Sequence, residues 1–304
     1  MSEINYYIKI GEIIKELRLK KNMTRKQLAD GICSVSYIGR IENGERCPTS
    51  VILRQITNKL GISPDYLFRA IESPTSLQVE ELLKRLYYYV ERCDFNNIYE
   101  LVNRKEKKLQ IESIHDLQIM KTIECVSSTI LNEDYQSGIN ELNNILDLTY
   151  NSNNTPTDIE FAIMSTQGFL LLLNNQKEEA YNHLNKIQIY INSINHFHSF
   201  AIIPRYYVYL ITACIDTLNL NEAILYIDFA INYCKKHNVH SILRELYFLK
   251  GELYYHLGKE NDFEIWLDKS LTLHELIKDC DYEYFDTFIK TRLKNNKKLT
   301  KYIG

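Results

Sequence analysis

The feature that most constrains this chain is the segment 24–46, where helix caps and apolar spacing predict two short helices joined by a tight turn. Thr24 followed by Gln27 is the pattern of a capping box, in which a hydroxyl and an amide satisfy free backbone groups at a helix start. Ser34 is a favoured N-cap for a second helix, and Gly31 permits the turn between the two. The segment therefore predicts a helix, a turn and a second helix.

The second helix is expected to have one buried and one exposed side. Ile38 and Ile41 lie three residues apart, so both face the core. Asn43 and Gly44 then end the helix, because both tolerate a left-handed backbone. The side chains expected to point outward are Val35, Ser36, Tyr37 and Arg40. A helix of this kind is suited to enter a DNA groove.

The segment closely resembles the helix-turn-helix of the Cro and phage-repressor (XRE) family, over about residues 8–68. Packing alone does not require the ordered residues that carry the resemblance, which are Arg18, Gln27-Leu28-Ala29, Ile38, Arg40-Ile41-Glu42-Asn43-Gly44, Pro48 and Leu60-Gly61-Ile62-Ser63. The resemblance implies that Arg18 and Glu42 pair across the bundle as a structural ion pair. Removal of either partner would leave a buried charge uncompensated, at a cost of about 3–5 kcal/mol.

Helix-turn-helix geometry assigns the expected DNA contacts. The N-terminal residues of the second helix meet base edges in the major groove, and in this chain they are Ser34, Val35, Ser36 and Tyr37. Packing is the alternative role of Tyr37. Arg40, one turn later, is expected to contact a guanine or a phosphate. Phosphate contacts are expected from Thr24 and Arg25 at the start of the first helix, and from Asn43 and Arg46.

Length and charge indicate a second domain of different character. A helix-turn-helix bundle needs only about 60–70 residues, whereas the chain has 304. Residues 1–62 hold 11 Lys and Arg against 6 Asp and Glu, a net charge of +5, and the remainder holds 25 against 33, a net charge of −8. A basic head on an acidic body suits salt-dependent DNA binding by the head. Pro74 disfavours helix at Ser73, so we expect a DNA-binding domain at 1–68, a linker at 69–76 and a second domain at 77–304.

The second domain is expected to be all-α, because helical stretches recur in pairs with a period of about 40 residues. The clearest pair spans 243–276, whose aromatic and glycine positions resemble those of a tetratricopeptide repeat (TPR), namely Tyr247, Gly251, Tyr254, Gly258 and Phe263. Weaker copies carry the small-residue pairs Ala223 and Ala230, Gly168 and Ala180, and Cys125 and Gly138. About five such pairs with C-terminal capping helices would stack into a right-handed superhelix with a concave groove. The alternative is an all-α body that only mediates dimerisation.

The whole architecture resembles the Rgg/NprR/PlcR/PrgX group, which are cytoplasmic quorum-sensing regulators of Gram-positive bacteria. The resemblance rests on the helix-turn-helix head, the short linker and the degenerate helix pairs. It implies a homodimer that binds double-stranded operator DNA through its two heads and a short linear signalling peptide in the groove. The enzymatic relatives of this group lack such a head, so the head favours transcriptional control.

Inward positions on the first helix of each pair are the candidate peptide contacts. They combine apolar and hydrogen-bonding groups, as a peptide requires, and they are Ile123, Ser127, Ser165, Phe169, Arg205, Val208, Thr212, Phe248, Glu252 and Tyr255. Arg205 is expected to hold a carboxylate such as a peptide C-terminus, and Asn174 to bond peptide backbone. Simple packing or solvent exposure is the alternative for each of them.

Other function classes find little support in the sequence. No GxxxxGK[ST] or GxSxG motif is present, and the histidine pairs 196/198 and 237/240 lack further ligands at metal-site spacing, so we expect no enzyme activity, cofactor or metal. No apolar run of about 18 residues predicts a membrane span, and the N-terminus does not read as a signal peptide, which favours a cytoplasmic location. The 7 cysteines form no CxxC pair and are expected to be mostly buried, reduced thiols. Three hypotheses stay open: a peptide-responsive transcription factor, a TPR-type protein-interaction module and a constitutive repressor without a ligand.

Overall fold

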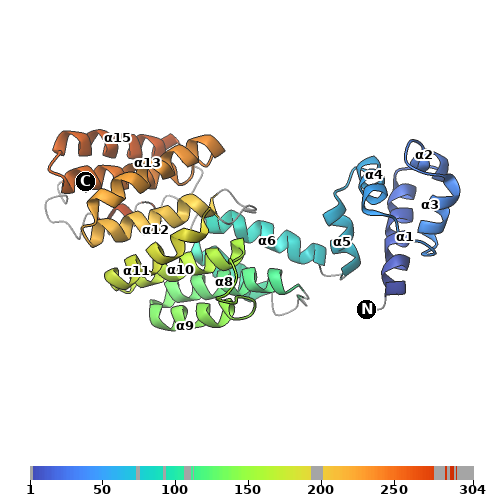
Figure 1. Ribbon diagram of the computed structural model, residues 1–304, viewed down its shortest axis with the longest axis horizontal. Coiled ribbons are helices and arrows are strands. Elements are labelled where there is room, and N and C mark those ends of the chain that lie inside the picture. The colour runs from blue at the N-terminus through green and yellow to red at the C-terminus, as the bar shows by residue number, and fades with distance from the viewer. Residues whose placement is uncertain are drawn as a thin grey trace. The chain divides into compact units, whose positions relative to one another are not determined.

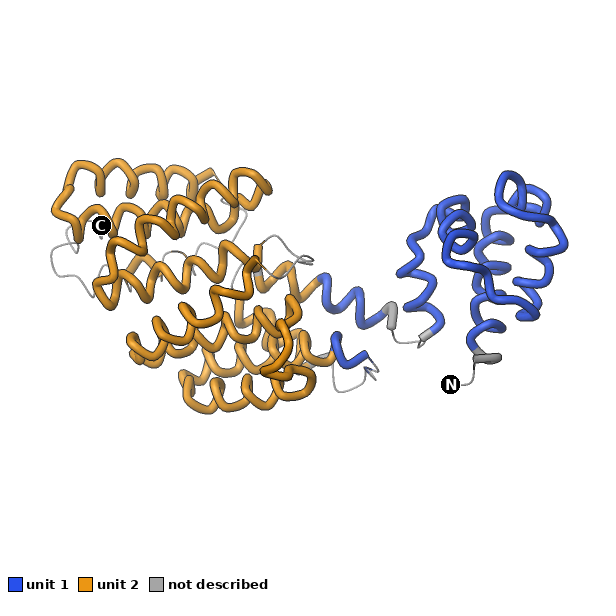
Figure 2. Tube along the Cα trace, viewed as in Figure 1, with its two compact units in different colours: residues 1–84, 107–116 blue, residues 85–106, 117–304 orange. Residues whose placement is uncertain are grey.

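The computed structural model describes residues 3–72, 76–91, 94–105, 111, 113–192, 201–276, 285, 288–290 and 292. Within these residues every regular element is a helix (Figure 1), so the all-α expectation is confirmed. The chain divides into two compact units, unit 1 with residues 1–84 and 107–116, and unit 2 with residues 85–106 and 117–304 (Figure 2). Each described helix is too short or too polar to cross a membrane.

Unit 1 begins with five helices, α1 (Glu3–Lys20), α2 (Arg25–Ala29), α3 (Val35–Glu42), α4 (Ser50–Leu60) and α5 (Pro64–Glu72). Their starts follow the polar caps that the sequence predicts. Thr24 and Gln27 form a capping box before α2, and Ser34 accepts a bond from the backbone N–H of Tyr37 at the start of α3. After α3 only Gly44 adopts the left-handed conformation, while Asn43 stays right-handed.

The core of unit 1 lies between these helices. Ile14 of α1, Leu28 of α2, Ile38 and Ile41 of α3 and Ile56 of α4 are inaccessible to solvent. Burial of each such side chain stabilises the fold by about 1.5–3 kcal/mol. The inward positions of Ile38 and Ile41 agree with the sequence prediction, and they fix which side of α3 faces solvent.

The crossing of α1 and α3 depends on Gly11, for which the sequence predicted no role. A Cβ atom at Gly11 would lie 2.2 Å from the carbonyl oxygen of Ile41 and 3.0 Å from the carbonyl carbon of Glu42. Both are backbone atoms, so no side-chain rotation relieves the clash. We predict that Gly11→Ala lowers the free energy of unfolding by about 1–3 kcal/mol, measured by urea denaturation.

A matched control for this substitution is Gly39→Ala on α3. A Cβ atom at Gly39 meets no atom closer than 3.8 Å, which is ordinary van der Waals contact. Alanine also forms helix more readily than glycine, so Gly39→Ala is expected to leave stability unchanged or slightly raised. Equal unfolding midpoints for Gly11→Ala and the unaltered chain would contradict the close crossing.

The helices after α5 come in consecutive pairs. They are α6 (Ser76–Glu91) with α7 (Phe95–Lys105), α8 (Ile114–Asn132) with α9 (Tyr135–Leu146), α10 (Asp158–Leu173) with α11 (Lys177–Ile187), α12 (Ile202–Asp216) with α13 (Leu220–His237), and α14 (Leu243–His256) with α15 (Glu260–Leu276). A short 3-10 helix, Gln188–Tyr190, follows α11. The described residues thus contain the five predicted pairs. Of the predicted C-terminal capping helices, residues 285, 288–290 and 292 are described, and they are helical.

Small residues let the two helices of a pair approach closely, as the repeat spacing predicts. A Cβ atom at Gly138 of α9 would lie 2.3 Å from Thr129 Oγ1 of α8, and one at Gly168 of α10 would lie 2.4 Å from Leu184 Cδ2 of α11. The first helices of successive pairs also contact one another, α10 with α12 and α12 with α14. These three helices form a layer of unit 2 that carries most of the candidate peptide contacts, whereas Ile123 and Ser127 lie on α8.

The two compact units differ from the predicted domain limits of 1–68, 69–76 and 77–304. Helix α5 runs to Glu72 and α6 starts at Ser76, so much of the segment expected as a linker is helical. Residues 73–75, at the predicted bend, lie outside the described residues. Unit 1 also includes the first half of α6. The domain limits therefore stay a prediction.

Candidate DNA-binding surface and peptide groove

Helix α3 is fastened to the rest of unit 1 by one buried carboxylate. The side chain of Glu42, at the end of α3, is fully buried and accepts bonds from Arg18 Nε at 2.6 Å and Arg18 Nη2 at 3.1 Å. Arg18 Nη1 also donates to the carbonyl oxygen of Met23 at 2.7 Å. Two parallel bonds between a guanidinium and a carboxylate make one of the strongest pairings in proteins. The structure thus contains the ion pair that the family resemblance implies.

A second arginine shares the same carboxylate, and no pattern in the sequence indicated it. Arg25 Nε donates to Glu42 Oε2 at 2.7 Å, although the Arg25 side chain is 41% exposed. Burial by itself raises the pKa of Glu42, but the hydrogen bonds and charges of Arg18 and Arg25 outweigh burial and hold that pKa below its usual value. The carboxylate therefore stays ionised at neutral pH with two arginines as counter-ions.

One face of α3 is exposed and carries most of the residues expected to meet base edges. Val35 is 45% exposed, and Ser34, Ser36 and Arg40 are exposed as well. The hydroxyl oxygens of Ser34 and Ser36 lie 3.0 Å apart and share a hydrogen bond. An apolar side chain beside small hydroxyls suits thymine methyl groups and the polar edges of bases.

Tyr37 and Arg40 differ in how firmly unit 1 holds them. Tyr37 is only partly exposed, packs against the core of unit 1 and donates its hydroxyl to the carbonyl oxygen of Cys47 at 3.4 Å. This geometry favours the packing role that the sequence left open. Arg40 Nε lies 3.7 Å from Glu45 Oε2 in an exposed ion pair. Exposed pairs are weak in water, so this one competes little with a base or a phosphate.

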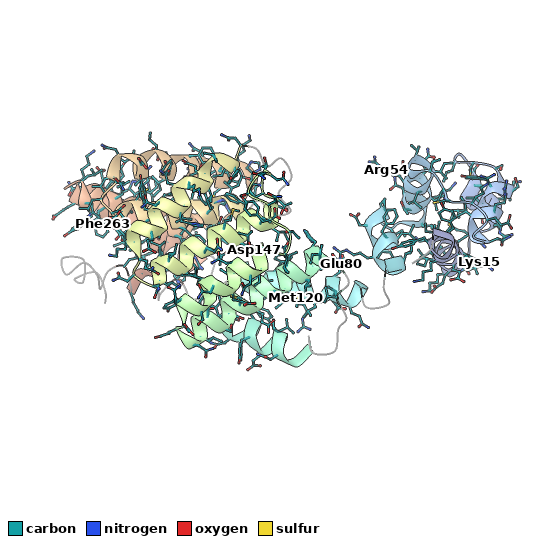
Figure 3. All side chains as sticks on the ribbon, turned by 60° about the horizontal axis from the view of Figure 1, so that its bottom comes forward. Lys15, Arg54, Glu80, Met120, Asp147 and Phe263 are labelled. Atoms are coloured by element: carbon teal, nitrogen blue, oxygen red, sulfur yellow. The ribbon has the colours of Figure 1, made fainter. Side chains whose placement is uncertain are left out.

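The remaining candidate phosphate contacts are polar groups at the surface of unit 1. Thr24 and Arg46 are exposed, and Asn43 Nδ2 donates to Glu45 Oε1 at 3.0 Å. Unit 1 carries further exposed cations, among them Lys15 and Arg54, whose side chains are labelled in Figure 3. Such an excess of exposed positive charge attracts a polyanion from a distance.

Most of the candidate peptide contacts are buried within unit 2. Those less than a tenth exposed are Ile123, Ser127, Ser165, Val208, Thr212, Phe248 and Glu252. The hydroxyls of Ser127 and Ser165 donate to carbonyl oxygens of their own helices. Thr212 Oγ1, by contrast, is buried without a hydrogen-bond partner among the residues that the structure describes. Burial favours the packing role for this set, the alternative that the sequence left open.

The partly exposed candidates gather on the layer formed by α10, α12 and α14. Phe169 of α10 stacks on Tyr209 of α12, with ring centroids 4.7 Å apart and an interplanar angle of 19°. One turn earlier on α12, Arg205 Nη1 donates to Glu245 Oε2 of α14 at 2.5 Å. The carboxylate expected to pair with Arg205 is therefore supplied by the chain itself. Tyr209 and Glu245 were missed, although their positions one turn from predicted residues were the available signal.

The other candidates also have partners within unit 2. Glu252 accepts bonds from Arg292 Nε at 3.0 Å and Nη2 at 2.9 Å, and Arg292 Nη1 donates to Asp216 at 2.8 Å. Asn174 follows the last residue of α10 and donates to a glutamine side chain two residues later at 2.6 Å. Tyr255 packs against the aromatic cluster of α14 and α15. Their roles as peptide contacts stay predictions.

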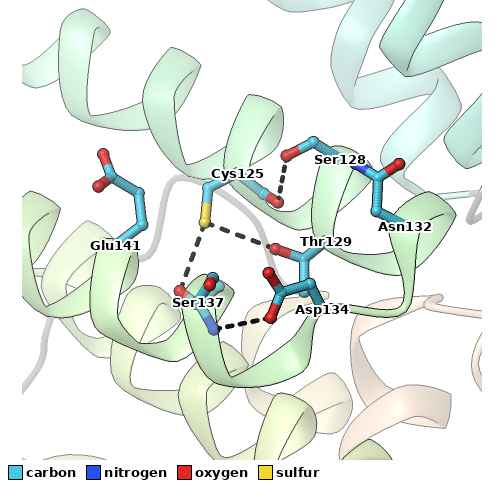
Figure 4. Close-up of a pocket in the computed structure, with 8 residues that line it drawn as sticks. Cys125, Ser128, Thr129, Asn132, Asp134, Ser137 and Glu141 are labelled. Atoms are coloured by element: carbon cyan, nitrogen blue, oxygen red, sulfur yellow. Dashed lines mark hydrogen bonds between the residues drawn. The ribbon is translucent and has the colours of Figure 1, made fainter.

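A pocket of about 200 Å³ opens between α8 and α9 (Figure 4), lined by Cys125, Ser128, Thr129, Asn132, Asp134, Ser137, Gly138 and Glu141. Cys125 Sγ lies 3.5 Å from the carbonyl oxygen of Gly138. Burial raises the pKa of the Cys125 thiol to about 11, so the thiol is protonated at neutral pH. No group of His, Cys, Asp and Glu in the described ranges is arranged to hold a metal ion. We assign this pocket to the packing of one helix pair.

Cysteine burial varies along the chain. Cys125, Cys214 and Cys234 are buried free thiols, whereas Cys33 is partly exposed and Cys47 is exposed. The other two cysteines, at 93 and 280, lie outside the described residues. The described thiols therefore only partly follow the expected burial.

Comparison with known proteins finds matches to the helix-turn-helix segment and to the fold of the chain. A helix-turn-helix family model matches residues 14–67, which include all of α2, α3 and α4. The crystal structure of Bacillus thuringiensis PlcR in complex with the peptide PapR7 and DNA has a TM-score of 0.78 at 20% sequence identity, and the match covers 89% of this chain and 96% of that chain. No curated protein matches the sequence.

Two further solved structures share the arrangement. ComR from S. thermophilus in complex with DNA and its signalling peptide ComS matches with a TM-score of 0.59 at 16% identity, over 89% of this chain and 94% of that chain. The Streptococcus dysgalactiae SHP pheromone receptor Rgg2 matches with a TM-score of 0.57 at 15% identity, over 93% of this chain and 99% of that chain. The chain therefore carries a helix-turn-helix domain, and its fold is the one seen in PlcR, ComR and Rgg2, a helix-turn-helix head followed by helical repeats.

Proposed function

We propose that the chain is a peptide-responsive transcriptional regulator of the quorum-sensing type. Unit 1 binds operator DNA, and unit 2 binds a short signalling peptide. The observation that carries the proposal is the match to PlcR bound to peptide and DNA, which extends over nearly the whole of both chains. The regulator acts in the cytoplasm as a homodimer, without catalysing a reaction and without a cofactor.

The DNA-binding half of the proposal is supported by the exposed face of α3 and by the charge of unit 1. Ser34, Val35, Ser36 and Arg40 are exposed on a helix whose other side is buried in the core. Arrays of this kind read base edges while surrounding cations hold phosphates. A dimer with two such heads reads a palindromic or pseudo-palindromic operator, with half-sites one helical turn apart or farther if the linker permits.

The peptide-binding half is supported by the layer of first helices. The stacked rings of Phe169 and Tyr209 lie beside the ion pair of Arg205 and Glu245. Partly exposed aromatic rings next to charged groups offer both apolar and polar contacts to an extended peptide. Peptide bound here shifts the population between two arrangements of the heads, because it changes the curvature of the repeats and acts across residues 63–75.

Peptide capture tests this half directly. We expect native mass spectrometry of the purified chain, mixed with culture-derived peptide fractions, to detect one bound peptide per protomer. Phe169→Ala is expected to weaken this binding by about tenfold, since an aromatic contact of this size is lost. Phe229→Ala is the matched control, because Phe229 is a 47% exposed aromatic on α13, outside that layer. Loss of binding in the Phe229 variant alone would contradict the placement of the groove.

A constitutive repressor without a peptide is the second candidate function. Seven candidate peptide contacts are buried among other residues of the chain, which is the arrangement expected of repeats that fill their own groove. This candidate keeps the same DNA-binding head. A repressor without a ligand predicts that no culture-derived fraction alters DNA binding and that no peptide is captured. The capture experiment therefore also distinguishes the two candidate functions.

A further inference from the structure

We infer that Glu42 is a positioning residue for DNA binding, because it holds the guanidinium of Arg25 beside the exposed face of α3 in an orientation suited to a DNA phosphate. The inference rests on the proposed function of unit 1 and adds a second role to the buried ion pair. Arg18 joins α1 to α3 through Glu42, whereas Arg25 binds the same carboxylate from the surface.

The bonding pattern of Glu42 supports two separate roles. Its Oε1 accepts from Arg18 Nε at 2.6 Å, and its Oε2 accepts from Arg25 Nε at 2.7 Å and from Arg18 Nη2 at 3.1 Å. The Arg18 side chain is 8% exposed, so its contacts lie in the interior, whereas the Arg25 side chain is 41% exposed. Arg25 uses its Nε, the nitrogen nearest the backbone, for Glu42. Its terminal nitrogens extend beyond that bond.

The position of Gly39 shows where the Arg25 guanidinium lies. A Cβ atom at Gly39 would be 3.8 Å from Arg25 Nη1 and 4.0 Å from Arg25 Cζ, so the guanidinium lies across α3 at this residue. Helical periodicity places Gly39 on the same face as Ser36 and Asn43, and Arg40 follows it directly in the sequence. All three of these neighbours are exposed. Arg25 therefore joins the face that carries the candidate DNA contacts, although it belongs to another helix.

This arrangement differs from two exposed ion pairs of unit 1. Lys20 with Glu16 and Arg40 with Glu45 pair exposed carboxylates, which hold a side chain loosely. Arg25 is instead bound to a carboxylate that is itself fixed by Arg18 inside the core. A side chain ordered before binding loses less conformational freedom when it meets a phosphate.

The same geometry explains why lysine is not an equivalent residue at this position. A guanidinium can donate from Nε to Glu42 and still present its terminal nitrogens to a second anion. A lysine has one ammonium group, which the buried carboxylate draws inward. We therefore expect that a positive charge alone at residue 25 is insufficient for full DNA binding.

The test measures DNA binding by full-length variants with fluorescence anisotropy across a series of salt concentrations. The probes are a duplex of the DNA flanking the protein's own gene and a random-sequence duplex of equal length. Arg25→Ala is expected to weaken binding to both duplexes by about tenfold and to reduce the slope of log affinity against log salt by about one. Arg25→Lys is expected to fall within about threefold of Arg25→Ala.

Lys26→Ala is the matched control, since Lys26 is the neighbouring exposed cation and, within the described part of the chain, forms no ion pair with a buried acid. It is expected to change affinity by less than about threefold. Arg25→Lys binding as tightly as the unaltered chain would overturn the inference, and so would an unchanged Arg25→Ala. Failure of the unaltered chain to bind either duplex would instead overturn the proposed function, and the inference with it.

Glu42→Gln examines the positioning role itself. At a temperature where circular dichroism shows the variant folded, it is expected to weaken DNA binding by the same factor as Arg25→Ala. The double variant is expected to bind DNA no more weakly than Glu42→Gln, because both substitutions remove the same contact between Arg25 and a phosphate. Additive losses would contradict positioning through Arg25. Should Glu42→Gln fail to fold, the comparison of alanine and lysine at residue 25 decides.

Discussion

Glu42→Ala is expected to lower the free energy of unfolding by about 3–5 kcal/mol, measured by chemical denaturation of the full-length chain. The substitution leaves Arg18, which is only 7% exposed, as a buried cation without a counter-ion. It also releases Arg25 from its carboxylate. The expected loss is large because the cost of an uncompensated buried charge exceeds the net contribution of an intact ion pair.

Glu45→Ala is the matched control for this prediction. Glu45 pairs with Arg40 at 3.7 Å, and both side chains are about half exposed. Exposed pairs contribute about 0–1 kcal/mol, so we expect little change in the unfolding midpoint. Similar losses for the two alanine variants would contradict the role assigned to the buried carboxylate.

The stabilisation by Glu42 should also depend on pH. The folded-state pKa of Glu42 is lowered, because its two arginines outweigh the effect of burial. A lowered pKa means that the contribution is fully present above the unfolded-state value of about 4.3 and is lost as the pH falls through the folded-state value. The stability difference between the unaltered chain and Glu42→Ala is therefore expected to shrink on acidification below that range. A difference that stays constant down to acid unfolding would contradict this assignment.

Arg40→Ala is expected to abolish sequence-specific operator binding, with a loss of roughly 100-fold in affinity for the operator. Arg40 is exposed on the same face of α3 as Ser36, and its pair with Glu45 is too weak to withhold it from DNA. The fold and the proposed dimer should persist, because the Arg40 side chain is exposed. Anisotropy titrations with operator and random duplexes, together with sedimentation of the free protein, measure the two effects.

The control for Arg40→Ala is Arg54→Ala, which removes an exposed cation from α4 instead (Figure 3). We expect the Arg54 variant to keep the ratio of specific to random binding, since loss of a distant charge weakens all DNA binding alike. Sequence-specific binding retained by Arg40→Ala would contradict the assignment of Arg40 to base or phosphate recognition.

Local sequence rules predicted much of unit 1. The capping box at Thr24, the N-cap at Ser34 and the buried pair Ile38 and Ile41 all depend on neighbours within a few residues, so pattern alone located α2 and α3. Gly11 was missed because its role comes from the close crossing of α1 and α3, which no local pattern encodes.

The bond between Arg25 and Glu42 was missed for a related reason. The two residues lie 17 positions apart, and only the packing of α2 against α3 brings them together. Sequence reasoning treated each in isolation, one as a phosphate contact and the other as the partner of Arg18. That Arg18 and Arg25 share the Glu42 carboxylate follows only from the positions of the three side chains.

Prediction was weaker in unit 2, because helical periodicity shows which residues face inward and not what fills the space there. Ser127, Val208 and Phe248 face inward and are buried by the chain itself. Arg205 was correctly placed on a first helix, but its partner Glu245 lies on another repeat. In degenerate repeats, the spacing of residues does not show which side chains pair between one repeat and the next.

Peptide control of DNA binding is measured by a mobility shift with the full-length chain and the DNA flanking its own gene, with and without culture-derived peptide fractions. We predict a shift that random DNA does not compete away and that changes when the active peptide fraction is added. A specific shift indifferent to every fraction would contradict regulation by peptide and favour the constitutive repressor. Absence of any shift would contradict DNA binding and favour a protein-interaction module.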